Sequence, residues 1–214
     1  MSKVNVGVLG SGDVGKSFAR AFAALGHEVM IGSRSPEKLA DFTAGAGAAV
    51  RGGTFEEAAK FGDLIALATL GTATTEALRI AGPQNFDGKV VIDATNPLDF
   101  STGAPKLFIG FEDSLGEQVQ RQLRGARVVK AFNTVGNAFF YKPQLPGGPP
   151  DMFLCGDDED AKRTVSQVCD AFGWGVVDIG GIDGARYLEP MCVVWVAHGL
   201  RSGSWTHAFK LLHG

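Results

Sequence analysis

The chain has 214 residues, of which 45% are hydrophobic, and its formal net charge is −3 at pH 7. This length and apolar content support one well-buried domain over residues 1–214, with residues 140–214 expected as a C-terminal extension that completes it. The small acidic charge is spread along the chain, which argues against a nucleic-acid partner or an anionic membrane surface.

A glycine-rich turn follows the first predicted strand. Residues 4–9 form an apolar, β-branched run that is typical of a buried parallel strand. Residues 17–25 are rich in good helix formers, and Gly26 follows them as a helix-ending signal. The segment between them has the spacing G-x-G-x-x-G, in the order Gly10, Ser11, Gly12, Asp13, Val14 and Gly15. A turn of this kind between a strand and a helix predicts a dinucleotide-binding loop.

Each glycine of this loop has a physical role in the prediction. Gly10 permits the tight turn, Gly12 lets the backbone approach a pyrophosphate, and Gly15 lets the helix pack close to the strand. The pyrophosphate would lie against the helix N-terminus, where unpaired N–H groups and the helix dipole favour an anion. The alternative is a strand-turn-helix corner that holds no nucleotide.

The second predicted strand, residues 27–31, ends without the acidic residue that commonly holds the ribose 2′-hydroxyl of NAD. Ser33 and Arg34 follow it instead, and Lys38 lies one helical turn further on. A hydroxyl, a guanidinium and an ammonium group all suit a 2′-phosphate. The sequence therefore predicts NADP rather than NAD, although either cation taken alone is typical of a solvated helix surface.

Strands and helices continue to alternate along the chain. A capping box of Thr54 and Glu57 opens a helix that runs to Lys60. Further helices are predicted at 36–42, 72–80, 114–123 and 158–172, and further strands at 48–51, 63–68, 89–93, 127–130, 152–155 and 174–178. This alternation predicts an α/β fold of the Rossmann type, with a doubly wound, mostly parallel sheet.

Two segments depart from the alternation. Residues 143–150 are rich in proline and glycine and are expected to form an irregular connection. Residues 184–212 carry apolar side chains at helical spacing, which predicts a long helix, interrupted near Gly203, that covers the sheet or a partner subunit. They form the small C-terminal helical portion of the predicted fold.

The strands that end near residues 9, 68, 93 and 130 are expected to meet at the crevice where an open α/β sheet binds its ligand. Thr69 and Leu70 would pass their backbone beside a nicotinamide ribose. Asn96 and Asn133 would place amides near a nicotinamide or a second ring, and Pro97 follows Asn96. The dipeptide Asn96-Pro97 is also compatible with a simple turn.

Acid and base groups are scarce at these strand ends. No Tyr-x-x-x-Lys pair marks a carbonyl reductase, and His27 begins its strand at the opposite edge, where a structural or solvated role is expected. Lys130 is either a general acid or part of a local ion pair, so the catalytic residue stays unassigned. Such a site suits hydride transfer between two redox cofactors, where positioning supplies most of the catalysis.

Targeting and metal-binding signals are also scarce. The N-terminal residues carry neither a basic segment nor an apolar signal core, and no stretch reaches the roughly 20 apolar residues of a membrane span. We therefore expect a cytoplasmic protein with no membrane partner. The cysteines at 155, 169 and 192 are far apart and are interpreted as small buried hydrophobes, so no metal site is predicted.

These features together resemble the NADP oxidoreductases that depend on coenzyme F420, a family that shares its fold with the reductase domain of the STEAP metalloreductases. The resemblance spans nearly the whole chain. It rests on the glycine loop, on Gly32-Ser33-Arg34 with Lys38, on Lys130–Thr134, on Cys155–Asp158 and on Gly184–Pro190. The chain departs from the archaeal members at Leu70-Gly71-Thr72 and Asn133, where those members are expected to carry Pro-Trp and His.

The resemblance also implies an activity and the residues that serve it. Ser11 to Val14 would bind the pyrophosphate of NADP, Ser33, Arg34 and Lys38 its 2′-phosphate, and Thr69, Leu70, Asn96 and Pro97 would border the nicotinamide. The implied reaction is hydride transfer between NADP(H) and a small-molecule partner, coenzyme F420 or a flavin, in a homodimer. Two alternatives stay open: an NADPH-dependent imine or carbonyl reductase of the β-hydroxyacid dehydrogenase type, and a non-catalytic NADP sensor.

Overall fold

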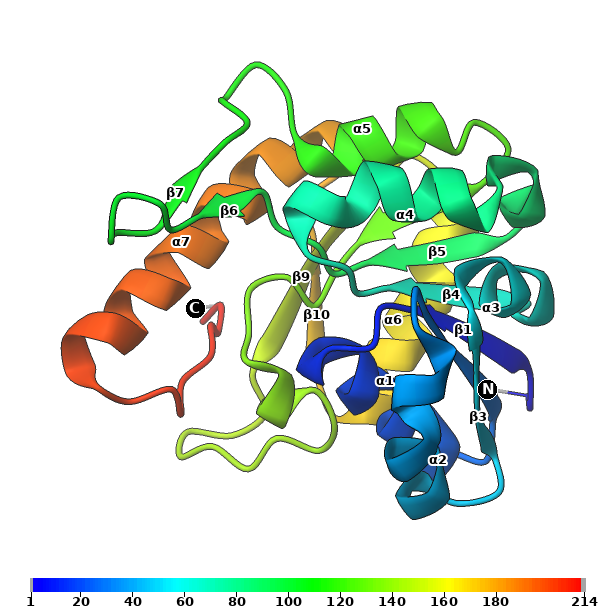
Figure 1. Cartoon of the computed structure of the whole chain (residues 1–214). Coiled ribbons are helices and arrows are strands. Elements are labelled where there is room, and N and C mark those ends of the chain that lie inside the picture. Colours follow the sequence, from blue (N-terminus) through cyan, green and yellow to red (C-terminus); the bar gives the residue numbers. More distant parts are fainter. Residues whose placement is uncertain (1, 213–214) are drawn as a thin grey trace.

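A computed structural model of the protein describes residues 2–212, and an eight-stranded sheet lies at its centre (Figure 1). The strand order is β10-β9-β8-β5-β4-β1-β2-β3. These strands are β1 (Asn5–Leu9), β2 (Glu28–Ser33), β3 (Val50–Thr54), β4 (Leu64–Leu67), β5 (Val90–Asp93), β8 (Arg127–Lys130), β9 (Asp151–Gly156) and β10 (Gly175–Asp178). All pairs from β3 to β8 are parallel, whereas β9 runs antiparallel to β8 and parallel to β10. The predicted doubly wound, mostly parallel sheet is therefore confirmed.

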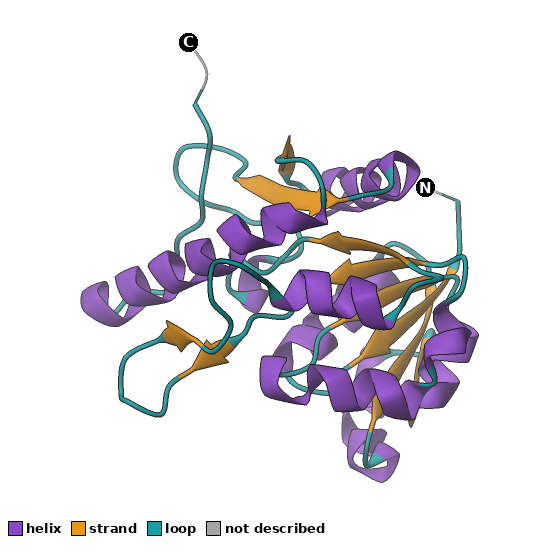
Figure 2. Ribbon diagram, turned by 90° about the horizontal axis from the view of Figure 1, so that it is seen from above, coloured by secondary structure: helices purple, strands orange, loops and turns teal. Residues whose placement is uncertain are grey.

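Helices cover both faces of the sheet (Figure 2). Successive side chains of a strand point to opposite faces, so Val6 and Val8 of β1 pack into one core and Leu9 into the other. The first core is covered by α1 (Asp13–Ala24), α2 (Ala40–Ala46) and α6 (Glu159–Phe172), and the second by α3 (Phe55–Phe61), α4 (Thr74–Ala81) and α5 (Leu115–Gln122). This two-sided cover leaves the carboxyl edge of the parallel strands open for ligands.

Aromatic rings fill the core beneath α1. Phe132 contacts Phe18, Phe140 and Phe172, with ring centroids 5.3, 5.2 and 5.7 Å apart. Its backbone φ of 63° lies in the left-handed region, which is rare for a bulky residue. The buried ring stabilises this conformation, and the chain turns sharply there as it leaves β8.

The predicted helix signals are largely confirmed. Thr54 and Glu57 form the predicted capping box at α3, and the acidic run near residue 158 opens α6, where the Asp158 carboxylate accepts the Ala161 N–H at 2.7 Å. However, α1 begins at Asp13, four residues before the predicted start. The glycine loop enters the helix directly because Gly12 serves as its N-cap. Short 3-10 turns add η1 (Pro36–Leu39), η2 (Gly71–Ala73), η3 (Pro83–Phe86), η4 (Asn137–Phe139) and η5 (Ile182–Gly184).

The C-terminal helix α7 (Ala185–Ser202) extends beyond the sheet, and the hairpin of β6 (Leu98–Asp99) and β7 (Lys106–Leu107) lies along it (Figure 1). The predicted interruption near Gly203 is confirmed, but the prediction of further helix from there to residue 212 is wrong. Gly203 adopts a left-handed φ of 68° that ends α7, and residues 203–212 return as an irregular segment, the C-terminal strap. The hairpin, with two residues in each strand, was not predicted.

Candidate functional site

Two adjoining cavities lie at the carboxyl ends of the parallel strands. The loop cavity, of about 660 Å³, is bordered by the segments that follow β1, β2 and β4. The aromatic cavity, of about 560 Å³, is bordered by the segments that follow β5 and β8, by α7 and by the C-terminal strap. Val14 and Asn137 line both cavities, so the two form one crevice.

The glycine loop forms the floor of the loop cavity, which is lined by Gly10, Ser11, Gly12, Asp13 and Val14. A Cβ atom on Gly10 would overlap the carbonyl oxygen of Ala68, and one on Gly15 would overlap the carbonyl oxygen of Gly10. A Cβ atom on Gly12 would meet nothing within 4 Å. The absence of a side chain at Gly10 and Gly15 therefore allows the close backbone contacts of the loop. Gly12 instead leaves open space for a ligand, as a pyrophosphate-binding loop requires.

The N-terminus of α1 points unpaired donors at this space. Gly12 has no side chain to cap the helix, and the first helical hydrogen bond runs from the Lys16 N–H to the Gly12 oxygen at 2.9 Å. The N–H groups of the first turn thus lack an intrahelical acceptor. Together with the helix dipole, they favour an anion in the loop cavity.

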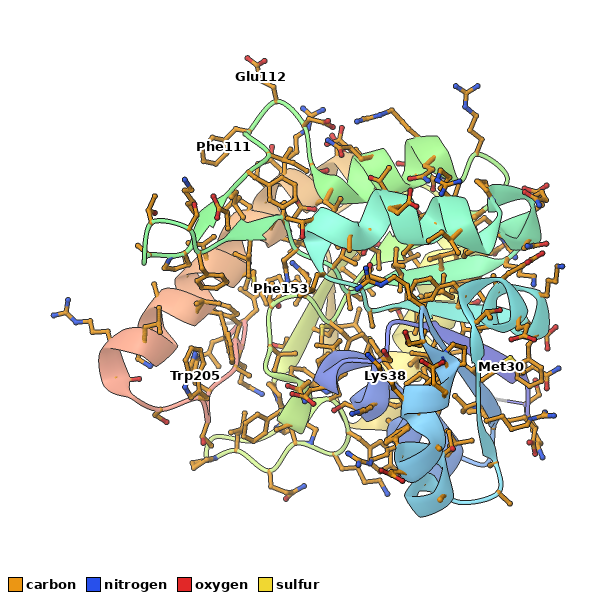
Figure 3. All side chains as sticks on the ribbon, in the orientation of Figure 1. Met30, Lys38, Phe111, Glu112, Phe153 and Trp205 are labelled. Carbon is orange, nitrogen blue, oxygen red and sulfur yellow. The ribbon has the colours of Figure 1, made fainter. Side chains whose placement is uncertain are left out.

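The far end of the loop cavity carries a cluster of donors. Ser33 is buried, and its Oγ accepts hydrogen bonds from the Ser11 hydroxyl and the Ser35 N–H, both at 3.1 Å. Its own hydroxyl hydrogen is then left to donate. Arg34 and Lys38 line the same end as exposed cations, and within residues 2–212 neither forms an ion pair (Lys38 in Figure 3). The donor set fits a phosphate monoester such as the 2′-phosphate of NADP.

The turn after β4 forms the opposite wall of the loop cavity through Thr69 and Leu70. The fully buried Thr74 holds this turn, because its hydroxyl contacts the Thr69 Oγ1 at 2.9 Å and donates to the Leu70 carbonyl at 3.0 Å. Leu70 itself is 78% exposed, which leaves an apolar side chain at the rim. Thr74 was not predicted, because a threonine in an otherwise ordinary helical stretch carries no signal for this role.

Asn96 and Asn133 line the aromatic cavity rather than the loop cavity, and they bind each other. The Asn133 amide donates to the Asn96 Oδ1 at 3.0 Å and to the Leu188 carbonyl at 2.9 Å, and the Asn96 amide donates to the Asn133 carbonyl at 2.8 Å. Both partners of the Asn133 nitrogen are acceptors, which fixes the orientation of this amide. Its Oδ1 is buried and finds no donor within residues 2–212. The buried Pro97 follows and packs beside Gly71.

Lys130, at the end of β8, has a fully buried side chain. Its ammonium contacts the Asp93 and Glu189 carboxylates, each at 2.9 Å, and Glu189 also accepts the Leu115 and Gly116 N–H groups at the start of α5. Burial alone would lower the pKa of Lys130, but the two carboxylates outweigh it and hold the pKa above its usual range. Of the two roles that the sequence left open, the structure therefore supports the local ion pair, which ties β5, β8 and α7 together.

Several lining residues of the aromatic cavity were not predicted. Trp195 and Cys192 come from α7, Phe139 from η4, and Trp205 from the C-terminal strap (Trp205 in Figure 3). Burial raises the pKa of the Cys192 thiol to about 12, so this side chain acts as an apolar group, as expected for the cysteines. These residues are distant in sequence and meet only after α7 has packed. No local motif in the sequence could have identified them.

A third cavity, of about 330 Å³, lies between the segment after β7 and α7. Its charged side chains are already paired, as in the Lys106–Asp99, Arg121–Asp113 and Arg186–Glu117 contacts. This third cavity therefore has fewer free polar groups to bind a ligand than the crevice has.

His27 lies at the opposite edge of the sheet, as predicted. It is 2% exposed, its Nδ1 accepts the Val4 N–H at 3.2 Å, and its ring packs against Phe22. The structural role is confirmed. Within residues 2–212, no three His, Cys, Asp or Glu side chains gather in a way that could hold a metal ion, and no helix is long and apolar enough to cross a membrane.

The sheet, the glycine loop and the donor cluster after β2 define a Rossmann-type NADP-binding protein. Comparisons with known proteins then identify the family within this class. Residues 5–97 match the family model "NADP oxidoreductase coenzyme F420-dependent". The F420-dependent NADP reductase of Methanothermobacter thermautotrophicus is 30% identical over 205 residues, which cover 90% of this chain and 88% of the relative. The chain belongs to this family and is an NADP-dependent oxidoreductase.

Other relatives agree with this assignment. A crystal structure of a provisionally assigned F420-dependent NADP-reductase from Arthrobacter sp. FB24 superposes with a TM-score of 0.93 at 35% identity, covering 98% of this chain and all of that one. Rat metalloreductase STEAP3 is 31% identical over 185 residues, which span 86% of this chain but 35% of that relative. A Streptomyces aurantiacus imine reductase has a TM-score of 0.69 at 18% identity, and 63% of its length is covered. This last likeness concerns the fold alone.

Proposed function

We propose that the protein transfers hydride between NADP(H) and a planar acceptor, coenzyme F420 or a flavin. The observation that carries the proposal is the crevice itself, in which a cavity rich in anion-binding groups adjoins a cavity walled by aromatic rings. The glycine loop and the N-terminus of α1 would hold the pyrophosphate. Ser33, Arg34 and Lys38 would hold the 2′-phosphate, and the turn at Thr69 and Leu70 would border the nicotinamide ribose.

The residues of the aromatic cavity would orient rings rather than exchange protons. Its lining contains no Asp, Glu, His, Lys or Tyr side chain among the described residues. When bound, NADPH supplies a hydride, which is two electrons and one proton, to the acceptor ring, and solvent supplies the second proton. Catalysis would then come from holding the two rings close and excluding water, for which positioning is sufficient.

The proposal is tested by anaerobic oxidation of NADPH, followed at the nicotinamide absorbance, with F420, FMN, FAD and riboflavin offered in turn. Turnover with F420 alone would support the family activity in this chain. Turnover with flavins alone would mean that the same crevice serves a different acceptor. Inactivity with deazaflavin, flavins and ferric chelates, together with tight NADPH binding, would favour the NADP sensor instead.

The imine or carbonyl reductase remains a second candidate with a weaker basis. Lys130, which would have been its general acid, is buried in an ion pair with two carboxylates rather than exposed in the crevice. Reduction of a cyclic imine by NADPH would revive it. Cytoplasmic location, homodimeric assembly and the single-domain organisation also remain predictions, and light scattering of the purified protein tests the dimer.

A further inference from the structure

The C-terminal strap completes the aromatic cavity, and hydrogen bonds fix its position. Trp205 and Thr206 of the strap line the cavity. The indole N–H of Trp195 donates to the His207 carbonyl at 2.9 Å, the Asp151 N–H donates to the Phe209 carbonyl at 3.0 Å, and the Leu211 N–H donates to the Asp151 carboxylate at 2.8 Å. The strap is therefore anchored both to α7 and to the start of β9.

Trp205 is seated on α7 at a glycine. A Cβ atom on Gly199 would overlap the Trp205 ring, so only glycine lets the indole lie this close to the helix. The ring centroids of Trp195 and Trp205 are 5.4 Å apart, and Trp205 keeps 45% of its surface exposed. Trp195 is buried and stacks on His207, with ring centroids 4.7 Å apart, so Trp205 is the indole of this wall that offers free surface for a further ring.

The lining of the aromatic cavity carries no charge among the described residues, in contrast to the loop cavity with Asp13, Arg34, Lys38 and Glu76. An anionic group placed in the aromatic cavity would lose its hydration without gaining a cation. Asn133 lines the cavity, and its buried Oδ1 has no donor among the described residues, so an N–H group of a ligand would satisfy it. The cavity is thus suited to a flat, uncharged heterocycle that carries an amide N–H.

We propose that the hydride acceptor is bound by its neutral ring, stacked on Trp205 in the wall that Trp195 and Trp205 form, while any phosphate or acidic tail stays outside the aromatic cavity. Trp205 is then an acceptor-binding residue supplied by the strap. This inference rests on the proposed function and adds the feature by which an acceptor is selected. Acceptors that share a ring should therefore have similar kcat/KM values, whatever the charge of their side chains.

Riboflavin and FMN provide the matched pair, because they share one ring and differ by a phosphate. The expected kcat/KM values agree within about threefold, and the KM for FMN stays nearly constant between low and high salt. Trp205→Ala should raise the KM for both about tenfold, Trp205→Phe should restore most of the loss, and the Kd for NADPH should not change. Tyr187→Ala, which removes a 70% exposed ring from α7 outside the cavity, is the control and should behave like the native protein.

A binding measurement separates this inference from the proposed function. Stacking on indole quenches flavin fluorescence, so riboflavin is titrated with the protein in the presence of NADP⁺. Tight binding that Trp205→Ala weakens about tenfold, combined with no reduction of riboflavin when NADPH replaces NADP⁺, would support the ring-binding wall while contradicting hydride transfer to flavins. The inference is overturned if FMN exceeds riboflavin tenfold in a salt-dependent manner, if Trp205→Ala matches the native protein, or if neither flavin binds.

Discussion

The loop cavity and the aromatic cavity adjoin each other and share two lining residues, yet they use opposite chemistry. The loop cavity combines a helix N-terminus with two exposed cations, so it offers charge and backbone N–H groups to an anionic ligand. The aromatic cavity has no charged lining residue and is closed by two indoles. One crevice can therefore bind a polyanion and a neutral ring side by side, because neither surface competes for the other's ligand.

The largest expected effect concerns the support of the aromatic cavity. Lys130→Met leaves the Asp93 and Glu189 carboxylates buried without a cation, which should lower the free energy of unfolding by about 3–5 kcal/mol. Urea denaturation measures this change in the free energy of unfolding. The control is Lys60→Met, which removes an exposed ion pair with Glu56 and should cost at most about 1 kcal/mol. A variant with native stability that loses only turnover would instead identify Lys130 as a general acid.

The next prediction separates the shape of the glycine loop from its contact with the ligand. Gly15→Ala forces a methyl group against the Gly10 carbonyl, so it should lower stability by about 1–3 kcal/mol and abolish NADPH binding. The methyl group of Gly12→Ala meets open space, so this variant should keep the native stability but bind NADPH more weakly. Thermal unfolding and NADPH titration of both variants test this division. Equal stability of the two would contradict the overlap at Gly15.

The charge of the loop cavity is tested by Arg34→Ala. Loss of charge-assisted hydrogen bonds to the 2′-phosphate should weaken the binding of NADPH by about 1.5–3 kcal/mol, which raises its Kd roughly tenfold to 150-fold. The Kd for NADH should stay almost unchanged. Arg163→Ala, which removes an exposed cation from α6, is the control. Equal weakening of both nucleotides would contradict the assignment of the 2′-phosphate site and weaken the contrast between the cavities.

The smallest expected effect is the contribution of His27 to the pH dependence of stability, and this residue lies outside both cavities. Burial lowers the pKa of His27 below its usual 6.5, so the folded protein keeps this ring neutral at a pH where the unfolded chain binds a proton. Its contribution to stability is complete above about pH 6.5 and is lost as the pH falls from there toward the folded pKa. His27→Asn, which retains an acceptor for the Val4 N–H, should flatten this part of the stability profile. An unchanged profile would contradict the lowered pKa.

The two cavities also differ in how far the sequence predicts them. The loop cavity is built mainly from short consecutive segments, so the spacing of Gly10 to Gly15 and the absence of an acid after β2 were enough to place Ser33, Arg34 and Lys38 together. The aromatic cavity joins residues from as far apart in the chain as Val14 and Thr206. Gly203 marks an interruption of the helix in the sequence, but the spacing of apolar side chains continues past it, and nothing local reveals that the chain turns back there to deliver Trp205. The left-handed Phe132 is likewise fixed by its packing rather than by its neighbours in sequence.

The place of the strap in the chain has a consequence for biosynthesis. The loop cavity is formed by residues that precede β8, except for Asn137, whereas the wall of the aromatic cavity waits for α7 and the strap. A domain generally folds as a unit, so neither cavity is complete before the last segment of the domain has left the ribosome. The chain synthesised up to β8 therefore carries nearly all of the lining of the loop cavity but lacks Phe140 and Phe172, which pack beneath α1, so we expect both cavities to form together after translation of the strap.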